Sequence, residues 1–119
     1  MFPDPDSFPL ARVAKRLRAL ADPGRLSVLQ KLCGGERCVT EIVDETGLGQ
    51  ANISKHLRIL LGEGFVLARR ERRNVFYRLS NGMSEEICAI ICRSIREKAA
   101  DDKRMLARYM SRKPARKVG

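Results

Sequence analysis

The spacing of apolar residues predicts two helices in the first third of the chain. Leucine and valine recur at helical intervals over residues 10–20, and basic residues occupy much of the rest of the helical wheel. The segment Ala-Asp-Pro-Gly that follows ends this helix and begins the next, because Asp22 suits an N-cap and Pro23 suits the first helical position. The second helix is expected to stop at the glycine pair 34–35.

A third and a fourth helix are predicted on either side of a tight turn. Residues 39–46 follow Cys38 with the spacing of a capping box, in which Glu41 is the third helical residue. The helix is expected to end at Gly47. Cys38 is an unusual N-cap, since Ser or Thr would cap this helix better. After the turn, residues 50–61 have an apolar stripe on one helix face and small and basic residues on the other.

A basic hairpin and a long last helix complete the pattern. Residues 65–80 predict two short strands around a Glu-Arg-Arg-Asn turn, since β-branched or aromatic residues occur in each arm. The last helix is expected to start near Ser84 as its N-cap and to reach Met110. We expect residues 1–8 to be a flexible lead-in, residues 9–110 to form one domain, and residues 111–119 to be a basic, disordered tail.

Composition and charge narrow the classes of function. The chain of 119 residues has 24 Lys and Arg against 14 Asp and Glu, a net charge of +10 that favours polyanions such as nucleic acid. With no Trp, 4 Phe and 2 Tyr, it is poorly supplied for stacking single-stranded bases, and its core is expected to be aliphatic. No apolar run reaches the ~20 residues of a membrane span and no signal peptide is evident, so we expect a cytoplasmic protein without a membrane partner.

The order of the elements predicts a winged helix-turn-helix, mainly helical with a small β-hairpin, in the order α-α-α-α-β-β-α. In that fold the second helix of the turn enters the major groove, and the hairpin, or wing, lies along the DNA. Residues 55–78 hold seven basic and two acidic side chains on those two elements. The DNA-binding residues expected from this pattern are Gln50, Ala51, Asn52, Ser54, Lys55 and Arg58 on the helix and Arg70 on the hairpin.

Four segments together resemble the ArsR/SmtB family of bacterial winged-helix repressors: RLRALADPGRLSVLQKL, ERCVTEI, LGQANISKHLRIL and GFVLARRERRNVFYRLS. The resemblance extends from Leu10 to about Ile95. It implies a homodimer, formed largely by the first and last helices, that binds a near-palindromic double-stranded DNA operator. It also implies an inducer, often a metal or metalloid ion, that releases the protein from the operator.

The same resemblance assigns roles to individual residues. On the fourth helix it implies that Gln50, Asn52, Ser54 and Lys55 face the bases. It implies a wing tip formed by Arg72, Arg73 and Asn74. His56 belongs to the family's His-Leu pair and is counted with the DNA-binding residues, although a structural or phosphate contact suits it better than a base contact.

Most ligands of the ion sites found in family members are missing from this chain. The family's third-helix box E-L-C-V-C-D-L appears here as ERCVTEI, which keeps Cys38 and has Thr40 in place of the second cysteine. The family's last-helix zinc site would fall on Asn81, Met83, Ser94 and Glu97, of which only Glu97 suits zinc. Persulfide-sensing relatives have a cysteine near Gln30 and another late in the last helix, and neither is present here.

Three hypotheses remain for the cysteines. Cys88 and Cys92 are four residues apart on one helix, so their Cβ atoms lie about 5–6 Å apart and could hold one soft ion. Cys38 would be the third thiolate around As(III) or Sb(III), because a helix N-terminus favours the thiolate form of a cysteine. Alternatively, Cys88 and Cys92 are packing residues, or they form a redox or reactive-sulfur switch. Cys33 is expected in the core.

The main hypothesis is therefore a DNA-binding repressor that needs no cofactor to bind DNA and that a thiophilic ion releases. A non-specific architectural protein would use the same charge without sequence preference, and a specific-to-nonspecific affinity ratio near one would reveal it. An enzyme would need a nucleophile beside a base in a cleft, whereas the single histidine of this chain is on the fourth helix.

Overall fold

The structure, a computed structural model, describes Asp4 and residues 9–112. The chain divides into two units, residues 1–84 and residues 85–119. The predicted lead-in, apart from Asp4, and the predicted tail beyond residue 112 lie outside the described residues. No described helix combines the length and the hydropathy that crossing a membrane requires.

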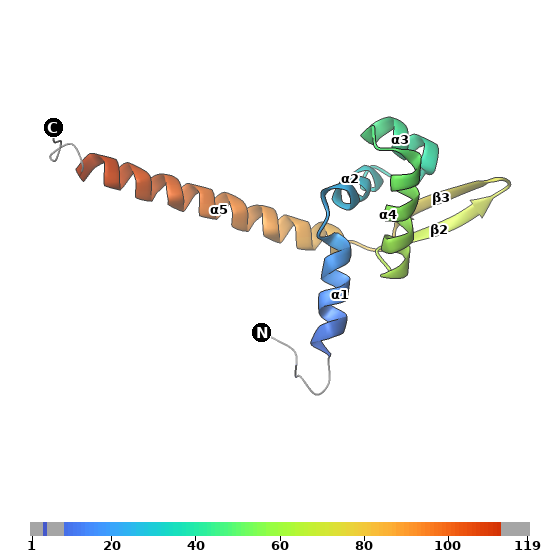
Figure 1. Ribbon diagram of the computed structural model, residues 1–119, viewed down its shortest axis with the longest axis horizontal. Helices are drawn as coiled ribbons and strands as arrows, with labels where there is room; N and C mark the ends of the chain where they lie inside the picture. The colour runs from blue at the N-terminus through green and yellow to red at the C-terminus, as the bar shows by residue number, and fades with distance from the viewer. Residues whose placement is uncertain (1–3, 5–8, 113–119) are drawn as a thin grey trace. The chain divides into compact units, whose positions relative to one another are not determined.

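The chain forms the mainly helical winged helix-turn-helix that the pattern predicts (Figure 1). Its elements are α1 (Leu10–Leu20), α2 (Pro23–Leu32), β1 (Arg37–Cys38), α3 (Val39–Thr46), α4 (Gln50–Gly62), β2 (Val66–Glu71), β3 (Asn74–Leu79) and α5 (Met83–Arg112). The predicted order lacked β1, so the observed order is α-α-β-α-α-β-β-α. The last helix also continues past the predicted end at Met110 to Arg112.

The wing is a three-stranded antiparallel sheet in the order β1-β3-β2, not a two-stranded hairpin. Glu71 pairs with Asn74 at the tip, which leaves a two-residue connection. At the other side of β3, Arg37 pairs with Tyr77 and Cys38 with Phe76. The backbone of β1 thus ties the middle of the hairpin to the segment that leads into α3.

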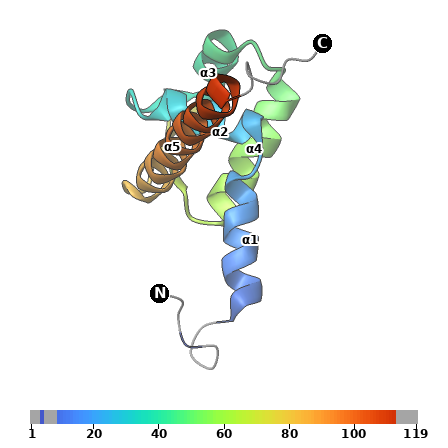
Figure 2. The same cartoon turned by 90° about the vertical axis from the view of Figure 1, so that its left-hand side faces the viewer.

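The core of the first unit lies among α2, α3, α4 and the base of the wing, and Figures 1 and 2 show these three helices gathered together. Its buried apolar residues are Ala19, Leu20, Val28, Leu29, Leu32, Ile42, Ile53, Leu57, Leu60, Phe65 and Val66. The core is aliphatic as expected, with Phe65 as the one aromatic member among the described residues. The expectation that Cys33 is buried is wrong: it follows the last turn of α2 and is exposed.

The N-cap of α2 forms as predicted. A carboxylate oxygen of Asp22 accepts a hydrogen bond from the backbone N–H of Arg25 at 3.0 Å, and Pro23 is the first helical residue. This hydrogen bond is the main cause that lowers the pKa of Asp22 below its ordinary value of 3.8. A carboxylate whose pKa is lower in the folded than in the unfolded chain stabilises the fold above its unfolded pKa.

We expect Asp22→Ala to lower the free energy of unfolding by about 1 kcal/mol at neutral pH, because one backbone donor of α2 loses its partner. The difference between the variant and the wild type should shrink as the pH falls through the lowered folded-state pKa, where the cap becomes protonated. Urea unfolding over a series of pH values measures this difference. A difference that stays constant from neutral pH to about pH 2 would contradict the assignment.

The start of α5 differs from the prediction in its capping residue. The helix begins at Met83, whose backbone N–H donates to the side-chain oxygen of Asn81 at 2.9 Å. Ser84 therefore lies inside the first turn, and it is buried. The side chain that accepts a hydrogen bond from the first N–H of α5 is thus that of Asn81, three residues before the expected N-cap, Ser84.

Candidate nucleic-acid interface

The turn between α3 and α4 is fixed by local hydrogen bonds. Gly47 ends α3 with a φ of 75°, a left-handed conformation that suits glycine. The hydroxyl of Thr46 donates to the carbonyl of Ile42 at 2.7 Å and accepts from the N–H of Leu48 at 3.2 Å. At the other end of α3, the carboxylate of Glu41 accepts from the N–H of Cys38 at 2.9 Å, in the predicted capping box. Both ends of the first helix of the helix-turn-helix are thereby defined.

The two faces of α4 separate as the sequence predicts. Ile53, Leu57 and Leu60 are buried and anchor the helix to the core. The opposite face is exposed at Gln50, Ala51, Asn52, Lys55 and Arg58, with Ser54 half-buried among them. No side chain caps the helix start at Gly49, so the first-turn N–H groups lie beside this face. The exposed face thus combines amide, hydroxyl and basic groups.

His56 does not belong to that outward face. Its side chain is only 14% exposed and lies against α2, with Nε2 3.8 Å from a carboxylate oxygen of Asp22. A Cβ atom at Gly24 would approach Nε2 to 2.5 Å, so glycine is needed where the ring packs. The Nδ1 atom is buried without a described hydrogen-bond partner. The role expected for His56 is a structural contact or a phosphate contact. The contacts with Asp22 and Gly24 agree with the structural role, and they place the side chain away from the exposed face of α4.

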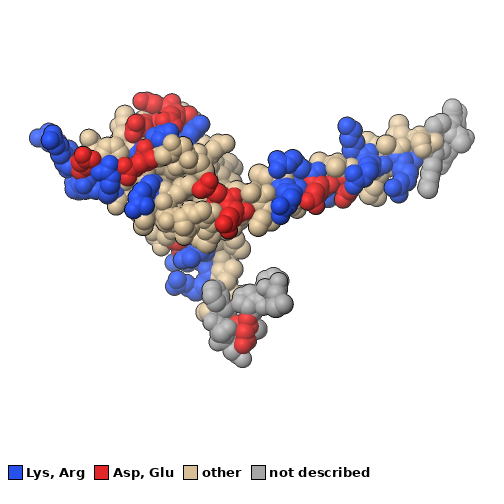
Figure 3. Space-filling view, turned by 180° about the vertical axis from the view of Figure 1, so that it is seen from behind, with Lys and Arg blue, Asp and Glu red and all other residues tan. Residues whose placement is uncertain are grey.

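The tip of the wing carries the highest density of exposed arginine. Arg70, Arg72 and Arg73 are exposed together with Asn74, and none of the three arginines forms an ion pair with a described residue. Figure 3 shows basic side chains gathered at this end of the molecule. Arg72 has a φ of 57°, which makes it the one described non-glycine residue with a left-handed backbone. That conformation costs an ordinary residue about 1–2 kcal/mol.

We expect Arg72→Gly to raise the free energy of unfolding by roughly 0.5–1 kcal/mol, because glycine adopts the left-handed conformation without strain. Arg73→Gly removes the same charge at a residue that lacks a positive φ, so it should destabilise the fold through added chain entropy. Thermal unfolding of the two variants provides the comparison. Equal effects of both substitutions on the melting temperature would contradict this account of the turn.

Arg69, which the sequence did not single out, braces the wing. Its guanidinium forms hydrogen bonds with both carboxylate oxygens of Glu36, at 2.7–3.0 Å, and with Glu71 at 2.7 Å. It also lies 4.9 Å from the centre of the Phe76 ring. The hydrogen bonds to Glu36 are the main cause that raises the pKa of Arg69, and they lower the pKa of Glu36. Arg69 therefore joins β2 to the segment before β1, and its charge is matched inside the protein.

Because its charge is already paired, we expect Arg69→Gln to weaken DNA binding several-fold without changing the salt dependence of binding. The loss would come from a wing that is less well held, rather than from a lost phosphate contact. Fluorescence anisotropy over a salt series measures both quantities. A salt slope reduced as much as by Arg73→Gln, which removes an unpaired charge, would show that Arg69 contacts DNA instead.

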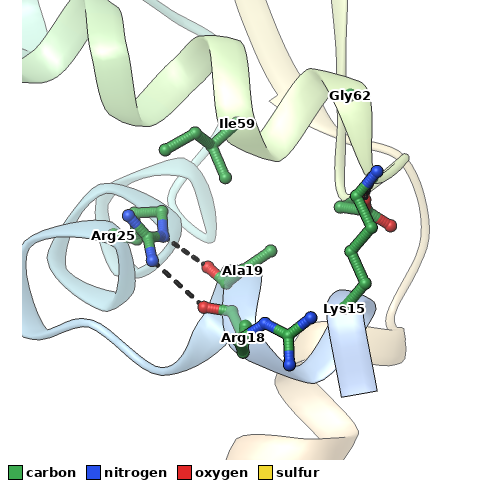
Figure 4. A pocket seen from close by; sticks show the side chains of 7 residues that line it. Lys15, Arg18, Ala19, Arg25, Ile59 and Gly62 are labelled. Atoms are coloured by element: carbon green, nitrogen blue, oxygen red, sulfur yellow. Dashed lines mark hydrogen bonds and ion pairs between the residues drawn. The ribbon is translucent and has the colours of Figure 1, made fainter. Parts of the chain in front are cut away.

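A shallow pocket of about 340 Å³ lies among α1, α2 and the end of α4 (Figure 4). Its lining residues are Lys15, Arg18, Ala19, Arg25, Ile59, Gly62 and Glu63. The guanidinium of Arg25 donates to the carbonyls of Ala19 at 2.7 Å and Arg18 at 3.0 Å. Glu63 lies 3.8 Å from the ammonium of Lys15. Arg25 and Glu63 therefore join α1 to the core and are already engaged with protein groups.

The cysteines proposed as ligands belong to different units. Cys38, half-buried, is in the first unit, whereas Cys88, half-buried, and Cys92, exposed, are on α5 in the second. Burial raises the pKa of the Cys88 thiol, and the neighbouring Cys92 adds to the effect. Among the described residues, no three His, Cys, Asp or Glu side chains are grouped so as to hold a metal ion.

A helix-turn-helix followed by a basic wing defines the chain as a winged-helix protein of the DNA-binding class. Residues 22–67, which include both helices of the turn, match the family model described as "Bacterial regulatory protein, arsR family". The chain belongs to this family, as the sequence resemblance indicated. The description of this family is that of regulatory proteins.

Two curated relatives illustrate the match. A probable mercury resistance operon repressor of Streptomyces lividans is 44% identical over 64 residues, which cover 54% of this chain and 51% of the relative. An uncharacterized HTH-type transcriptional regulator of Methanocaldococcus jannaschii is 37% identical over 81 residues, 67% of this chain and 91% of that protein.

Among solved structures, the homodimeric winged helix-turn-helix DNA-binding domain of a possible ArsR-family regulator of Mycobacterium bovis has a TM-score of 0.69. It is 32% identical, and the match covers 82% of this chain and 91% of that domain. The chain spans about half the length of the curated relatives that it matches first, at 51% and 48%.

Proposed function

We propose that this chain is a homodimeric transcriptional repressor that binds a near-palindromic operator in the cytoplasm and that a thiophilic ion, As(III) or Sb(III), releases. The observation that carries the proposal is the exposed face of α4 next to a wing with three unpaired arginines. Gln50, Asn52, Ser54 and Lys55 contact base edges, while Arg70, Arg72, Arg73 and Asn74 bind the backbone. Ala51 allows close approach, and Arg58 binds a phosphate.

Exposed apolar residues support the homodimer. Leu10 and Leu17 on α1 are exposed, and α5 has further exposed isoleucines at 90, 91 and 95. Apolar surface of this extent is typical of a protein interface. The similar domain from Mycobacterium bovis is also homodimeric. A two-fold dimer presents two copies of α4 to two half-sites, which is why the operator is expected to be near-palindromic.

The donor set on α5 favours As(III) over zinc. The half-buried thiol of Cys88, whose pKa is raised, must lose its proton to bind a divalent metal ion. As(OH)3 differs, because each thiol that binds it supplies the proton with which a hydroxide leaves as water. Cys88 and Cys92 would form two such bonds, and Cys38 of either subunit is the candidate third ligand. One relative bears the name of a repressor of mercury resistance, and mercury is another thiophilic metal.

A redox or reactive-sulfur response is the second candidate, and the exposure of Cys92 favours it because an oxidant reaches that thiol directly. The test uses the DNA upstream of the gene for this chain, labelled for fluorescence anisotropy, with a shuffled duplex as control. The repressor should bind the upstream DNA at least 1000-fold more tightly than the control. Equal affinities would identify a non-specific architectural protein. Titration of the complex with As(III), Zn(II) and persulfide then identifies the inducer.

A further inference from the structure

The residue that follows α4 carries a charge that its position disfavours. Glu63 caps the C-terminus of α4, and its backbone N–H donates to the carbonyl of Ile59 at 3.1 Å. The C-terminal end of a helix has a partial negative charge, which repels a carboxylate. The side chain of Glu63 is also only 13% exposed, and a carboxylate withdrawn from water needs an opposite charge nearby. The place of Glu63 therefore depends on the cations around it.

Both cations that face Glu63 come from α1. One carboxylate oxygen lies 3.8 Å from the ammonium of Lys15, and the other lies 3.7 Å from Nε of Arg16. In the part of the chain that the structure describes, no residue of another element forms an ion pair with Glu63. Adjacent residues of a helix point about 100° apart, so Lys15 and Arg16 approach the carboxylate from two sides. We call these three side chains the Glu63 bridge.

The middle of α1 has little other support. The buried residues of this helix are Ala19 and Leu20, both in its last turn, and Arg25 binds carbonyls of that same turn. Further toward the N-terminus, Leu17 and Leu10 are 49% and 56% exposed. The last turn of α1 is thus fixed to the core by packing, whereas the preceding turns are held to α4 by the Glu63 bridge.

The bridge spans a junction that is not closed by apolar packing. The pocket described above lies between α1 and the end of α4, and Figure 4 shows the side chain of Lys15 extending from α1 toward Gly62 along one side of it. Close-packed side chains resist displacement in every direction. Where a pocket replaces them, the ion pairs of Glu63 determine how far the two helices lie apart.

The two ends of the bridge belong to helices with different tasks. α4 presents the exposed face proposed to bind the operator, and α1 carries two of the exposed leucines that support the homodimer. A dimer gains affinity from binding two half-sites at once, provided that its two copies of α4 have the spacing of those half-sites. Freedom between α1 and α4 reduces this gain, because the ordering must then occur on binding.

We propose that Glu63 is a positioning residue for operator recognition. Through Lys15 and Arg16 it holds α4 at a defined place relative to α1, and it thereby sets the spacing of the two copies of α4 in the dimer. The inference rests on the proposed homodimeric repressor. The negative charge of Glu63 opposes the binding of any DNA, so its removal affects operator and non-operator DNA in opposite directions.

The substitution Glu63→Gln tests the proposal by the sign of its effect. Loss of a negative charge should slightly strengthen the binding of shuffled DNA, whereas loss of the bridge should weaken operator binding about fivefold or more. Fluorescence anisotropy on both duplexes measures the two affinities. Asp44→Asn is the matched control, because Asp44 is exposed on α3 and forms no ion pair with a described residue. It should strengthen binding to both duplexes alike. Tighter operator binding by Glu63→Gln would overturn the proposal.

An operator with one half-site scrambled separates positioning from damage to α4. Only one copy of α4 binds this DNA specifically, so Glu63→Gln should bind it at least as tightly as the wild type does. Equal losses on the complete and the half-scrambled operator would show that α4 itself is impaired, and they would overturn the proposal.

A mutant cycle tests whether the three charges act as one unit. Lys15→Gln/Arg16→Gln should reduce the preference for the complete over the half-scrambled operator as much as Glu63→Gln does. The triple variant should show no further loss, because the bridge is already broken. Losses that add in the triple variant would contradict the bridge.

Hydrogen exchange tests the bridge in the full-length chain without DNA. Amides of residues 14–18 in α1 should exchange faster in Glu63→Gln than in the wild type, while those of α3 should be unchanged. Unchanged exchange in α1 would overturn the bridge. A wild type that binds operator and shuffled DNA equally would instead overturn the proposed function, and the exchange result would still decide whether the bridge holds α1.

Discussion

Operator affinity should fall about 10⁴-fold when the concentration of monovalent salt rises from roughly 50 to 200 mM. The reason is the release of counterions from each phosphate that a basic side chain neutralises. Arg58, Arg70, Arg72 and Arg73 are exposed on α4 and the wing, so a dimer would neutralise about eight phosphates. The slope of log K against log salt is then about −7.

Removing the wing-tip charges should change that slope in a predictable way. The double substitution Arg72→Gln/Arg73→Gln eliminates four contacts per dimer, and the slope should become about −3.5. Affinity should fall for all DNA sequences alike, since phosphate contacts carry little sequence information. Anisotropy titrations on operator and shuffled DNA at four salt concentrations measure both effects. A wild-type slope shallower than about −3 would contradict the proposed footprint of helix and wing.

Replacing both cysteines of α5 should abolish the release of the operator by As(III). Cys88→Ser/Cys92→Ser removes both proposed sulfur ligands from α5 while leaving α4 and the wing untouched, so binding in the absence of the ion should stay as in the wild type. The lost coupling between ion and DNA is expected to be about 1–3 kcal/mol, or roughly 5- to 150-fold in operator affinity. Operator titrations with and without As(III) measure it.

Two single variants complete the cysteine series. Cys33→Ser changes an exposed residue after α2 and should leave release unchanged. Cys38→Ser should lose the response if Cys38 is the third ligand. A full response combined with higher stability would instead assign Cys38 to capping alone, since serine is the better N-cap. Release by As(III) at the wild-type concentration in the double variant would contradict the proposed site and leave packing as the role of Cys88 and Cys92.

The helix boundaries could be predicted because local chemistry determines them. Asp22 and Pro23 start α2, Glu41 completes the capping box of α3, and Gly47 ends α3 in the left-handed conformation. Each of these signals depends on residues within one helical turn. The exposed face of α4 could also be predicted, since a buried stripe at helical spacing determines which residues are opposite to it.

The features that escaped prediction depend on contacts between distant residues. β1 is two residues long and has no periodicity of its own, and it exists because Arg37 and Cys38 pair with β3. Arg69 is one arginine among several in the wing sequence, and only its distance from Glu36, 33 residues earlier, distinguishes it. The inward orientation of His56 likewise follows from its approach to α2 at Gly24.

The strand order β1-β3-β2 leaves β2 as an open edge of the sheet. An open edge offers unpaired backbone groups to any other strand, and proteins commonly protect such edges with charge. Here three consecutive charged residues, Arg69, Arg70 and Glu71, lie along the outer half of the strand, next to the exposed Leu67. Their charges therefore hinder the edges of two molecules from joining into a continuous sheet. Alanine substitutions at these positions would leave an apolar edge prone to aggregation, so glutamine is the better replacement when the wing is dissected.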